Sequence, residues 1–506
     1  MSMYQMNLRQ RTQSALLALL CLAATAMASC GDASTVAVDT ASVTPTETET
    51  VETEAVDPRL AYANVAPAVE DFGGYGYRMS VLVDNDVVFK QVAYWSEGEN
   101  GDTLNDAVYK RNLAVEEAYN VKISLIQLAD TNATVRKNIQ AADDFSDIIF
   151  PSNIGELLSL AQQGCFLDLN MVDELQLDQP WWDQRIQDLA IHGKLYCATG
   201  DISIRDELRE MAVLYNKTLY SQFDYPDPYD LVADNKWTWE TMASMIRDVA
   251  KDVNGDGDMT TADQYGLISE NIAGWYLFLA SGRDSISYDG KTYTSDIEDA
   301  SIYNIFEDIF EVLCDKKSVI IMDDGTHEKQ LTTETIWTEA TKIFSENRAL
   351  FRTGTFGDTV DLRDMKTDFG VLPIPKIDAN QDSYYCMTHV DIMPLVIPTT
   401  VPDEHKTALL TEALAFESMF ELTPSFYEVF LDEKILRDEK SKAMIDILFD
   451  SKVYSLDYVS GITGLMSTIS TIVQTGNNNL ASKTASIQKS AQKKLDKYIE
   501  KFADVE

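Results

Sequence analysis

Hydrophobic positions in the early part of the chain alternate between the period of two that marks strands and the longer period of helices. Residues 121–128 alternate apolar and polar side chains and predict a strand. Residues 102–119 gather their apolar side chains on one face and predict a helix. Residues 87–95 are a further strand candidate, and a helix at 133–142 followed by a strand at 147–150 repeats the unit. Repeated units of this kind favour an α/β fold with mostly parallel sheets flanked by helices.

Ligand sites in such sheets lie outside the carboxyl ends of the strands. The loops at residues 94–100 and 150–153 each follow a predicted strand, and both carry hydrogen-bonding side chains. We therefore expect part of a binding site in these two loops.

The first thirty residues have the order of a bacterial lipoprotein signal. A basic region with Arg9 and Arg11 precedes an apolar core at residues 15–26, which is too short to span a bilayer as a helix. Small residues then lead to Cys30, although Met27 stands where such signals usually carry leucine. The order predicts a signal peptide over residues 1–29 and lipidation of Cys30, which would anchor the protein at the extracellular face of the cell membrane. An ordinary secretory signal is the alternative.

The segment at residues 30–60 is rich in Thr, Ala, Val, Glu and Asp and is predicted to be a disordered acidic tether, because it has too little apolar surface to fold. The remaining body has ordinary globular composition and no later stretch of about twenty apolar residues, so we do not expect it to cross the membrane. Its length favours two domains.

The charge of the chain is strongly acidic. The formal net charge of −41 makes nucleic acid and anionic lipid poor partners.

Four cysteines remain after the signal and the lipidated residue, namely Cys165, Cys197, Cys314 and Cys386. For these cysteines, buried free thiols are as well supported as disulfides.

Several motifs occur in an order that resembles bacterial solute-binding proteins. Residues 164–169 read Gly-Cys-Phe-Leu-Asp-Leu after a strand, a loop and a helix, and residues 193–201 follow as the approach to a first interlobe crossover. Residues 212–217 resemble the strand motif L-x-Y-N-K, and residues 237–242 resemble the helix start T-W-D-E-L. Segments 349–358 and 368–376 resemble the return part of the fold and complete the order, which carries the resemblance because each motif alone is weak.

The chain thus resembles the sugar-binding, maltose-binding-protein-like solute-binding lipoproteins of bacterial ABC importers (family 1). The resemblance implies two α/β lobes that close on a carbohydrate, a permease as partner, no enzymatic activity, and a protein that we expect to be a monomer. We assign lobe one to residues 61–202 and 345–417, and lobe two to residues 203–344 and 418–506.

Residues 252–263 fit the twelve-residue calcium loop, with Gly257 at the sharp turn and Asp263 where a bidentate glutamate is usual. The segment after it resembles a turn and strand rather than a helix, so the sequence predicts one structural calcium site. A metal-free loop rich in Asp and Gly is the alternative. The expected ligands are Asp252, Asn254, Asp256, Asp258, Thr260 and Asp263.

Sugar clefts pair aromatic faces with hydrogen-bonding side chains. Among the seven tryptophans, Trp95 and Trp275 lie in polar and glycine-rich surroundings and are the best candidates, whereas Trp337 sits in a helical pattern and is predicted to be in the core, like Trp181, Trp182, Trp237 and Trp239. The full set of candidate ligand residues is Trp95, Glu97, Asn100, Ser152, Asn153, Asp201, Trp275, Tyr276, Phe356 and Asp358.

Two other functions remain open. A secreted glycoside hydrolase would need two carboxylates, but 82 acidic residues make such pairs uninformative, and no other catalytic motif occurs. A lipoprotein that reports ligand occupancy to a membrane kinase would have the same sequence features as an importer component. The sequence also leaves the ligand open, including a peptide in place of a sugar.

Overall fold

The computed structural model describes residues 57–82, 94–362, 365–432, 439–503 and 505. The body from Pro58 to Glu506 is one compact unit that contains two larger β-sheets with helices around them. Cys30, the signal peptide, nearly all of the tether and most of the strand predicted at residues 87–95 lie outside the described residues. None of the described helices is long and apolar enough to cross a membrane.

The first sheet has three parallel strands in the order β2-β1-β3. Its central strand β1 was not predicted, and it buries Tyr77, Met79 and Val81 almost completely. Residues 395 and 396 extend the sheet beyond β3, since Val396 pairs with Ile149 and Leu395 pairs with Ala198. The strands span Tyr75–Leu82 (β1), Val121–Leu128 (β2) and Ile148–Phe150 (β3), which confirms the strands predicted at 121–128 and 147–150.

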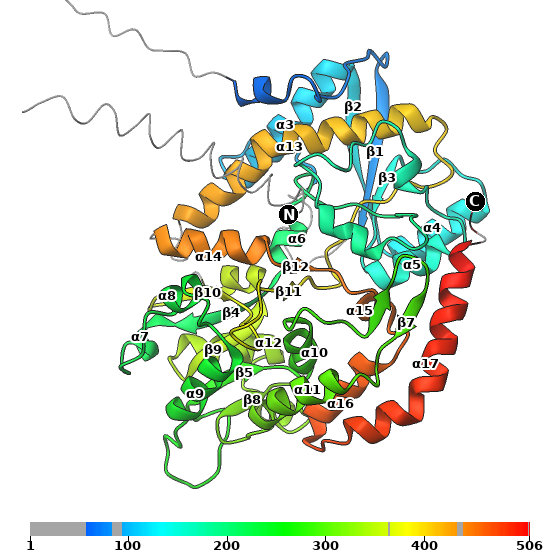
Figure 1. Ribbon diagram of the computed structural model, residues 1–506. Helices are drawn as coiled ribbons and strands as arrows, with labels where there is room; N and C mark the ends of the chain where they lie inside the picture. The colour runs from blue at the N-terminus through cyan, green and yellow to red at the C-terminus, as the bar shows by residue number, and fades with distance from the viewer. Residues whose placement is uncertain (1–56, 83–93, 363–364, 433–438, 504, 506) are drawn as a thin grey trace, which may run out of the picture. The chain divides into compact units, whose positions relative to one another are not determined.

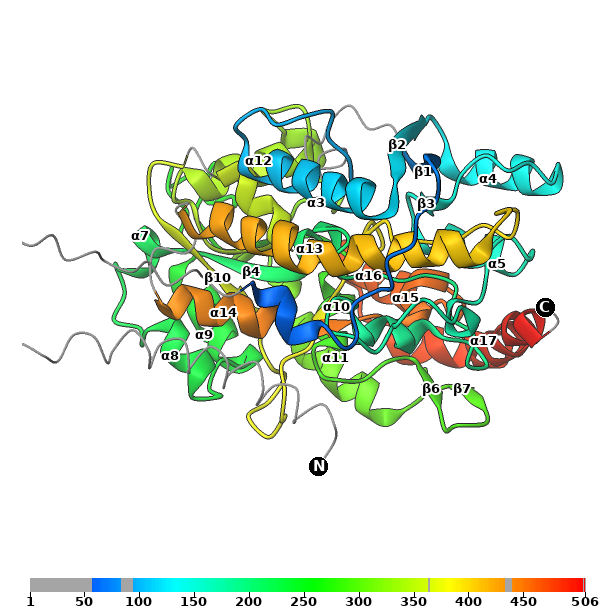
Figure 2. The same ribbon diagram turned by 90° about the horizontal axis from the view of Figure 1, so that it is seen from above.

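Four helices pack against the first sheet or against one another beside it. α3 begins after Asp102, whose side chain accepts a hydrogen bond from the Asn105 backbone, and it ends at Asn120 in the left-handed conformation. The long helix α13 packs along α3 (Figures 1 and 2). The helices span Thr103–Tyr119 (α3), Thr131–Gln140 (α4), Ile154–Ala161 (α5) and Glu404–Asp432 (α13), so the helix predicted at 102–119 is confirmed.

The second sheet has five strands in the order β10-β4-β9-β5-β8. β5 runs parallel to both β8 and β9, whereas β4 runs antiparallel to β9 and β10. The strands span Met211–Asn216 (β4), Tyr265–Ser269 (β5), Val319–Ile321 (β8), Ala349–Thr355 (β9) and Phe369–Pro373 (β10). The helices before α13 in this part span Lys217–Tyr220 (α7), Pro228–Ala233 (α8), Trp239–Val249 (α9), Ala273–Leu279 (α10), Ala300–Leu313 (α11) and Ile336–Ser345 (α12).

The strand pairing differs from the predicted lobe boundaries in one respect. Residues 345–373 were assigned to lobe one, but β9 and β10 pair with strands of the second sheet. The motif order along the chain could not show this, because neighbouring strands in a sheet are set by pairing and not by sequence distance. From here, lobe one means the first sheet with its helices, and lobe two means the second sheet with its helices.

Short segments connect the lobes, and the C-terminal helices complete them. α6 precedes β4, and the two-stranded sheet of β11 and β12 lies next to it through a bridge between Glu210 and Thr388. The remaining helices and strands are α6 Arg205–Leu208, β6 Ile286–Tyr288, β7 Tyr293–Ser295, β11 Cys386–Met387, α14 Glu439–Phe449, β12 Lys452–Val453, α15 Leu456–Ser460, α16 Leu465–Thr475 and α17 Leu480–Ala503. Five 3₁₀ helices are η1 Pro58–Tyr62, η2 Leu169–Met171, η3 Gln184–Leu189, η4 His327–Gln330 and η5 Phe356–Leu362.

A buried arginine fixes the loop that follows the first sheet. Arg111 on α3 is 1% exposed and donates hydrogen bonds to the carbonyl oxygens of Tyr94 at 2.6 Å and Ile202 at 2.9 Å. It also contacts the hydroxyl of Ser418 on α13 at 3.3 Å. Since these partners come from three distant parts of the chain, Arg111 holds the residues next to Trp95 in place.

The four cysteines of the body are free thiols. Three of them are buried, and burial raises the pKa of the Cys197 thiol to about 12. They therefore pack as small apolar side chains.

Candidate functional site

Carboxyl groups gather at one edge of the second sheet. Because β5, β8 and β9 are parallel, their carboxyl ends lie at the same edge. Glu270 directly follows β5, Asp323 comes two residues after β8, and Asp358 comes three residues after β9. This edge is where open α/β sheets bind ligands.

Two of these carboxylates have hydrogen-bond partners. Asp323 accepts hydrogen bonds from Asn271, at 2.8 Å from its backbone nitrogen and 2.6 Å from its side-chain nitrogen. Asp358 accepts the backbone N–H of Thr355 at 3.0 Å and lies 3.5 Å from the guanidinium of Arg352. Both carboxylates are therefore held in fixed positions.

Glu270 lies between them, and no side-chain hydrogen bond to it occurs within the described residues. Burial, together with the negative charges of Asp323 and Asp358, raises its pKa to about 8, and Arg352 offsets this only in part. At neutral pH the Glu270 carboxyl therefore keeps its proton and can donate a hydrogen bond to a ligand oxygen.

An exposed tryptophan stands at the same edge. α12 lies between β8 and β9 in the chain, and both strands run parallel to β5. The helix therefore begins near the carboxyl ends of the strands and runs back in the opposite direction. Its first turn thus lies at the edge that carries the carboxyl groups. Trp337 lies in this first turn and is 48% exposed. The prediction that Trp337 belongs to the core is wrong. The helical pattern of apolar residues does not show which face of the helix is covered by another part of the protein.

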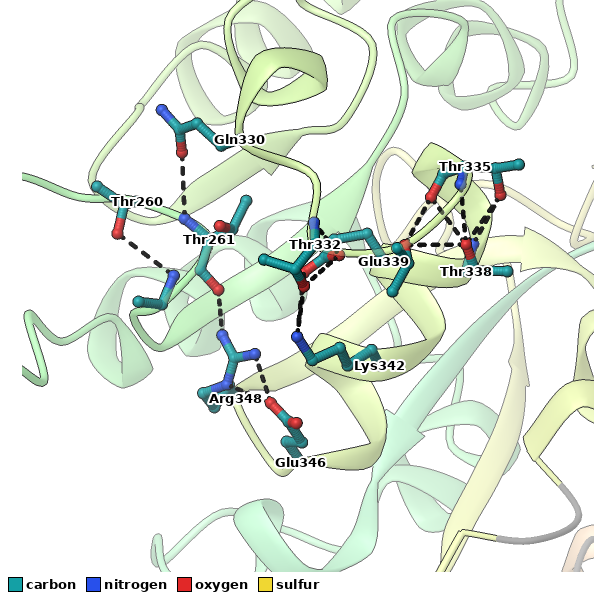
Figure 3. Close-up of polar contacts among 12 residues, drawn as sticks. Thr260, Thr261, Gln330, Thr332, Thr335, Thr338, Glu339, Lys342, Glu346 and Arg348 are labelled. Carbon is teal, nitrogen blue, oxygen red and sulfur yellow. Dashed lines mark hydrogen bonds and ion pairs between the residues drawn. The ribbon is translucent and has the colours of Figure 1, made fainter.

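Polar contacts hold the first turn of α12 rigidly (Figure 3). Thr335 and Thr338 form a reciprocal capping box. The buried carboxylate of Glu339 accepts hydrogen bonds from the backbone of Thr332 at 2.8 Å and from its hydroxyl. Lys342 donates to the same hydroxyl at 2.5 Å. The contacts fix the first turn of the helix that carries Trp337.

The two lobe-one loops predicted to bind ligand have several side chains that are buried or bonded within the protein. Tyr94 is buried with its ring 4.0 Å from that of Phe150, and Trp95 beside it is partly exposed. The side chain of Asn153 caps α5 by accepting the backbone N–H of Gly155 at 2.8 Å. Ser152 is partly buried beside the Thr131 hydroxyl at 3.4 Å.

Glu97 and Asn100 are exposed. The Asn100 side chain accepts the backbone N–H of Asp102 at 2.8 Å, so it shapes the start of α3.

The segments that connect the lobes add charged groups next to these loops. Arg205 and Arg209 both contact Asp391 at 3.1 Å. The backbone N–H of Asp391 donates to the ring of His389 at 3.2 Å, and burial and Arg209 lower the pKa of His389. The charges of Asp358 and Asp391 act on His389 in the opposite direction, so the lobe-two edge and the connecting segments are electrostatic neighbours.

Other predicted ligand residues are packed in the interior of this structure. Trp275 has no exposed surface, and the hydroxyl of Tyr276 is hydrogen-bonded to Thr353 at 2.6 Å. Phe356 packs with its ring 5.3 Å from that of Phe449. Asp201 accepts a hydrogen bond from the hydroxyl of Thr423 at 2.7 Å. The structure thus places Asp358 at the candidate site and leaves Trp95 partly exposed, whereas Trp275, Tyr276 and Phe356 are buried.

The loop predicted to bind calcium is closed by its own hydrogen bonds. Asp252 accepts the backbone N–H groups of Gly255 at 2.6 Å and Gly257 at 2.8 Å. Asp263 is fully buried and accepts those of Val253 and Thr260, each at 2.9 Å. Among the described residues, no group of three or more His, Cys, Asp or Glu side chains is arranged to hold a metal ion. These backbone hydrogen bonds fix the turn of the loop, and the calcium site stays a prediction.

The sequence analysis missed Glu270, Asp323, Arg209, His389 and Asp391. The signal for the first two was present, since each follows a short apolar run that becomes a buried parallel strand. The carboxyl-end rule was applied only to lobe one, where the alternating pattern was clearer. Nothing in the sequence marks the other three, because their role depends on how the connecting segments meet.

The family model for bacterial extracellular solute-binding proteins matches residues 114–437. A maltose/maltodextrin-binding domain from Bdellovibrio bacteriovorus bound to maltotriose is similar in structure, with a TM-score of 0.51 and 13% sequence identity over 83% of this chain and 100% of that chain. An ABC substrate-binding protein from Listeria monocytogenes in complex with cycloalternan has a TM-score of 0.51 and 11% identity over 84% of this chain and 99% of that one. At these identities the similarity shows a shared two-lobed fold, which confirms the predicted fold class. No curated protein sequence matches the chain.

The raised pKa of Glu270 predicts a pH-dependent stability. An exposed glutamate titrates near ~4.3, so between about pH 4 and about pH 8 the folded protein binds one more proton than the unfolded chain, and stability falls as pH rises through this window. Glu270→Gln should remove this contribution, and the variant should be more stable than the wild type at about pH 8.5 but not at about pH 4.5. Denaturant titrations at both pH values measure the difference. The exposed residue Glu117, changed to Gln, is the control, and an identical pH dependence of wild type and Glu270→Gln would contradict the assignment.

Proposed function

The chain belongs to the family of bacterial extracellular solute-binding proteins, and we propose that it binds a carbohydrate between its two lobes and delivers it unchanged to an ABC permease. The observation that carries the choice of ligand is the exposed Trp337 at the same sheet edge as Glu270, Asp323 and Asp358. An aromatic face covers the apolar side of a sugar ring, while carboxyl groups bind its hydroxyls.

Two further points support a sugar. The proteins with a similar fold from Bdellovibrio bacteriovorus and Listeria monocytogenes hold maltotriose and cycloalternan. The site also has both hydrogen-bond donors and acceptors, because a protonated Glu270 donates whereas Asp323 and Asp358 accept. Sugar hydroxyls do both, so each kind of group finds a partner.

A glycoside hydrolase is the second candidate that an observation favours. Glu270 has a raised pKa and Asp358 stands near it, as general acid and nucleophile do in such enzymes. Membership in a family of binding proteins supports binding without chemistry. Chromatography of the bound sugar separates the two functions, since only an enzyme returns shorter products.

The first prediction for this function concerns the aromatic surface. A thermal-shift screen of mono- and oligosaccharides identifies a ligand, because binding to the folded state raises the melting temperature. Trp337→Ala and Trp95→Ala should each weaken binding of that sugar by roughly 1–3 kcal/mol, the scale of a lost apolar contact. Titration calorimetry measures the change.

Tyr288, a 49% exposed aromatic residue on the β6–β7 hairpin, provides the matched control. Tyr288→Ala should bind the sugar as the wild type does. If Trp337→Ala also binds with unchanged affinity, the site lies elsewhere; if peptides bind and sugars do not, the protein is a binding protein for another class of solute.

We also propose that Cys30 is lipidated and anchors the protein at the outer face of the membrane, as the basic, apolar and small residues before it indicate. Cys30→Ala should appear in the medium or remain unprocessed. Membrane fractionation and the mass of the N-terminal peptide measure this. Normal processing and retention of the variant would exclude the anchor.

The calcium loop gives the next prediction. Extracellular sites of this general kind bind at about 10⁻⁴ to 10⁻³ M, and a hundredfold excess of ligand over its dissociation constant adds about 2.7 kcal/mol. Calcium should therefore raise the melting temperature of the wild type, and Asp252→Ala should not respond. Equal melting of the wild type with calcium and with chelator would support the alternative of a metal-free loop.

A further inference from the structure

The first connection between the two lobes is dense in buried charge. Residues 205–210 read Arg-Asp-Glu-Leu-Arg-Glu, and Arg205, Asp206 and Glu210 are buried. Burial of an ionised group is costly unless a counter-charge or hydrogen bonds compensate. Each of these side chains therefore needs a partner or a proton inside the protein.

Lys452 on β12 is the cation that faces this segment. Its amino group lies 2.7 Å from Asp206, 3.3 Å from Glu207 and 3.4 Å from Asp183, and its side chain is 6% exposed. Glu210 is next to it and accepts a hydrogen bond from the hydroxyl of Thr388 at 2.9 Å. We name Lys452, Asp183, Asp206, Glu207 and Glu210 the crossover network.

The network joins parts that belong to different lobes. Asp183 is fixed to lobe one, because its backbone N–H donates to Thr199, whose neighbour Ala198 pairs in the extended first sheet. Lys452 lies on β12, whose partner β11 bridges to Glu210 directly before β4 of the second sheet. The ion pair of Asp183 with Lys452, and the hydrogen bond from the Tyr454 hydroxyl to Asp183 at 3.0 Å, thus connect the two lobes.

Arg185 adds a second connection of the same kind. Its guanidinium donates to the carbonyl oxygen of Phe449 at 3.0 Å and to that of Asp450. A change in the relative position of the lobes has to stretch or break these contacts.

Acidic groups in the network outnumber basic ones. Four carboxyl groups face Lys452, and Arg185 is the additional cation close enough to act on Asp183 and Glu210. One oxygen of Glu210 is buried without a hydrogen-bond partner in the described parts of the chain, and the Glu207 carboxyl is within hydrogen-bond reach of Asp206. With all four carboxyl groups ionised, the network would hold excess negative charge although Asp206 and Glu210 are fully buried and the side chains of Asp183 and Glu207 are only 11% and 19% exposed.

The direction of the pKa shifts agrees with this geometry. Burial raises the pKa of Glu207 and of Glu210 well above its ordinary value, and the charge of Asp206 adds to the effect on Glu207. Burial also opposes ionisation of Asp183, but Lys452 and Arg185 overcome it and lower its pKa. Burial therefore favours the protonated form of Glu207 and of Glu210.

The other titratable groups that face the network are neutral and add no positive charge to it. Tyr427 on α13 and Cys386 on β11 lie within reach of the charges of Glu207 and Glu210, and the pKa of each is raised by burial and by that charge. Tyr454, directly after β12, is also buried and neutral, since its pKa is raised. Among these elements only Lys452 and Arg185 oppose the negative charge.

We propose that the crossover network is a proton-dependent latch on lobe movement: protonated Glu207 and Glu210 stabilise the arrangement of the connecting segments seen here, and loss of the protons shifts the protein to a more open arrangement. This proposal rests on the proposed function, because it assumes that the two lobes move relative to each other when the protein binds and releases its solute. Glu207, Glu210 and Lys452 act through the connecting segments, so they are positioning residues.

The sign follows from the raised pKa values. Both glutamates hold their protons more tightly in the network than in water, so the arrangement of the connecting segments seen here binds more protons than a more hydrated one. As pH rises through the titration of the two glutamates, negative charge without a partner accumulates, and only water entry between the segments relieves it. The open arrangement therefore gains population as pH rises.

Small-angle scattering of the sugar-free protein between about pH 6 and about pH 9.5 tests the latch, because it needs no knowledge of the ligand. The wild type should show a larger radius of gyration at high pH. The double variant Glu207→Gln/Glu210→Gln cannot ionise at these positions and should keep the low-pH value throughout. Asp284→Asn is the control, since Asp284 is a carboxyl group outside the network whose pKa burial raises to about 6, and it should behave as the wild type.

Each other outcome overturns the proposal. A wild-type radius of gyration that does not change with pH, or a double variant that expands as the wild type does, excludes the latch. A melting temperature that changes with pH at constant radius of gyration shows a structural role alone. Sugar binding measured by calorimetry is independent of these results, so failure of the carbohydrate proposal and failure of the latch can be told apart.

Discussion

The parallel arrangement of β5, β8 and β9 is the constraint on which the site depends. Parallel strands bring their carboxyl ends to one edge, so the residues that follow them meet there although they are far apart in the chain. Glu270, Asp323 and Asp358 come together for this reason alone. The same constraint returns the first turn of α12, with Trp337, to that edge.

The connecting segment before β4 makes two separate sets of ionic contacts, one through its arginines and one through its carboxyl groups. Arg205 and Arg209 contact Asp391 beside the candidate site, while Asp206 and Glu207 contact Lys452 between the lobes. A solute that changes the first group of contacts acts on the same short segment that holds the second. This arrangement gives binding and lobe movement a common physical element, as linkage between two states requires.

Local pattern predicted the units of the fold but not their assembly. The helix α3 and the strand β2 were predicted at nearly their observed bounds, since the periods of 3.6 and 2 are read directly from apolar positions. The central strand β1 was not predicted, and most of the strand predicted at residues 87–95 lies outside the described residues. The residues of β9 and β10 were assigned to lobe one, but both strands pair in the second sheet. The order of segments along the chain does not show which strands pair.

The candidate site shows the same limit. Asp358 was predicted from a motif and stands at the sheet edge, whereas Trp275 was chosen for its polar neighbours and is fully buried. Trp337 was assigned to the core from its helical pattern but is 48% exposed, because the exposure of a tryptophan depends on which elements cover it. Glu270 shows that a pKa near neutrality comes from burial between two other carboxyl groups, which a sequence does not display.

The central claim is that the protein holds a carbohydrate intact against the lobe-two edge. A crystal structure of the protein with the sugar found in the thermal-shift screen tests it most directly. We expect an uncleaved sugar with one ring on the face of Trp337 and hydroxyl groups bonded to Glu270 and Asp358. A sugar bound away from this edge, with Trp337 still exposed, or a cleaved product at the edge, would contradict the account.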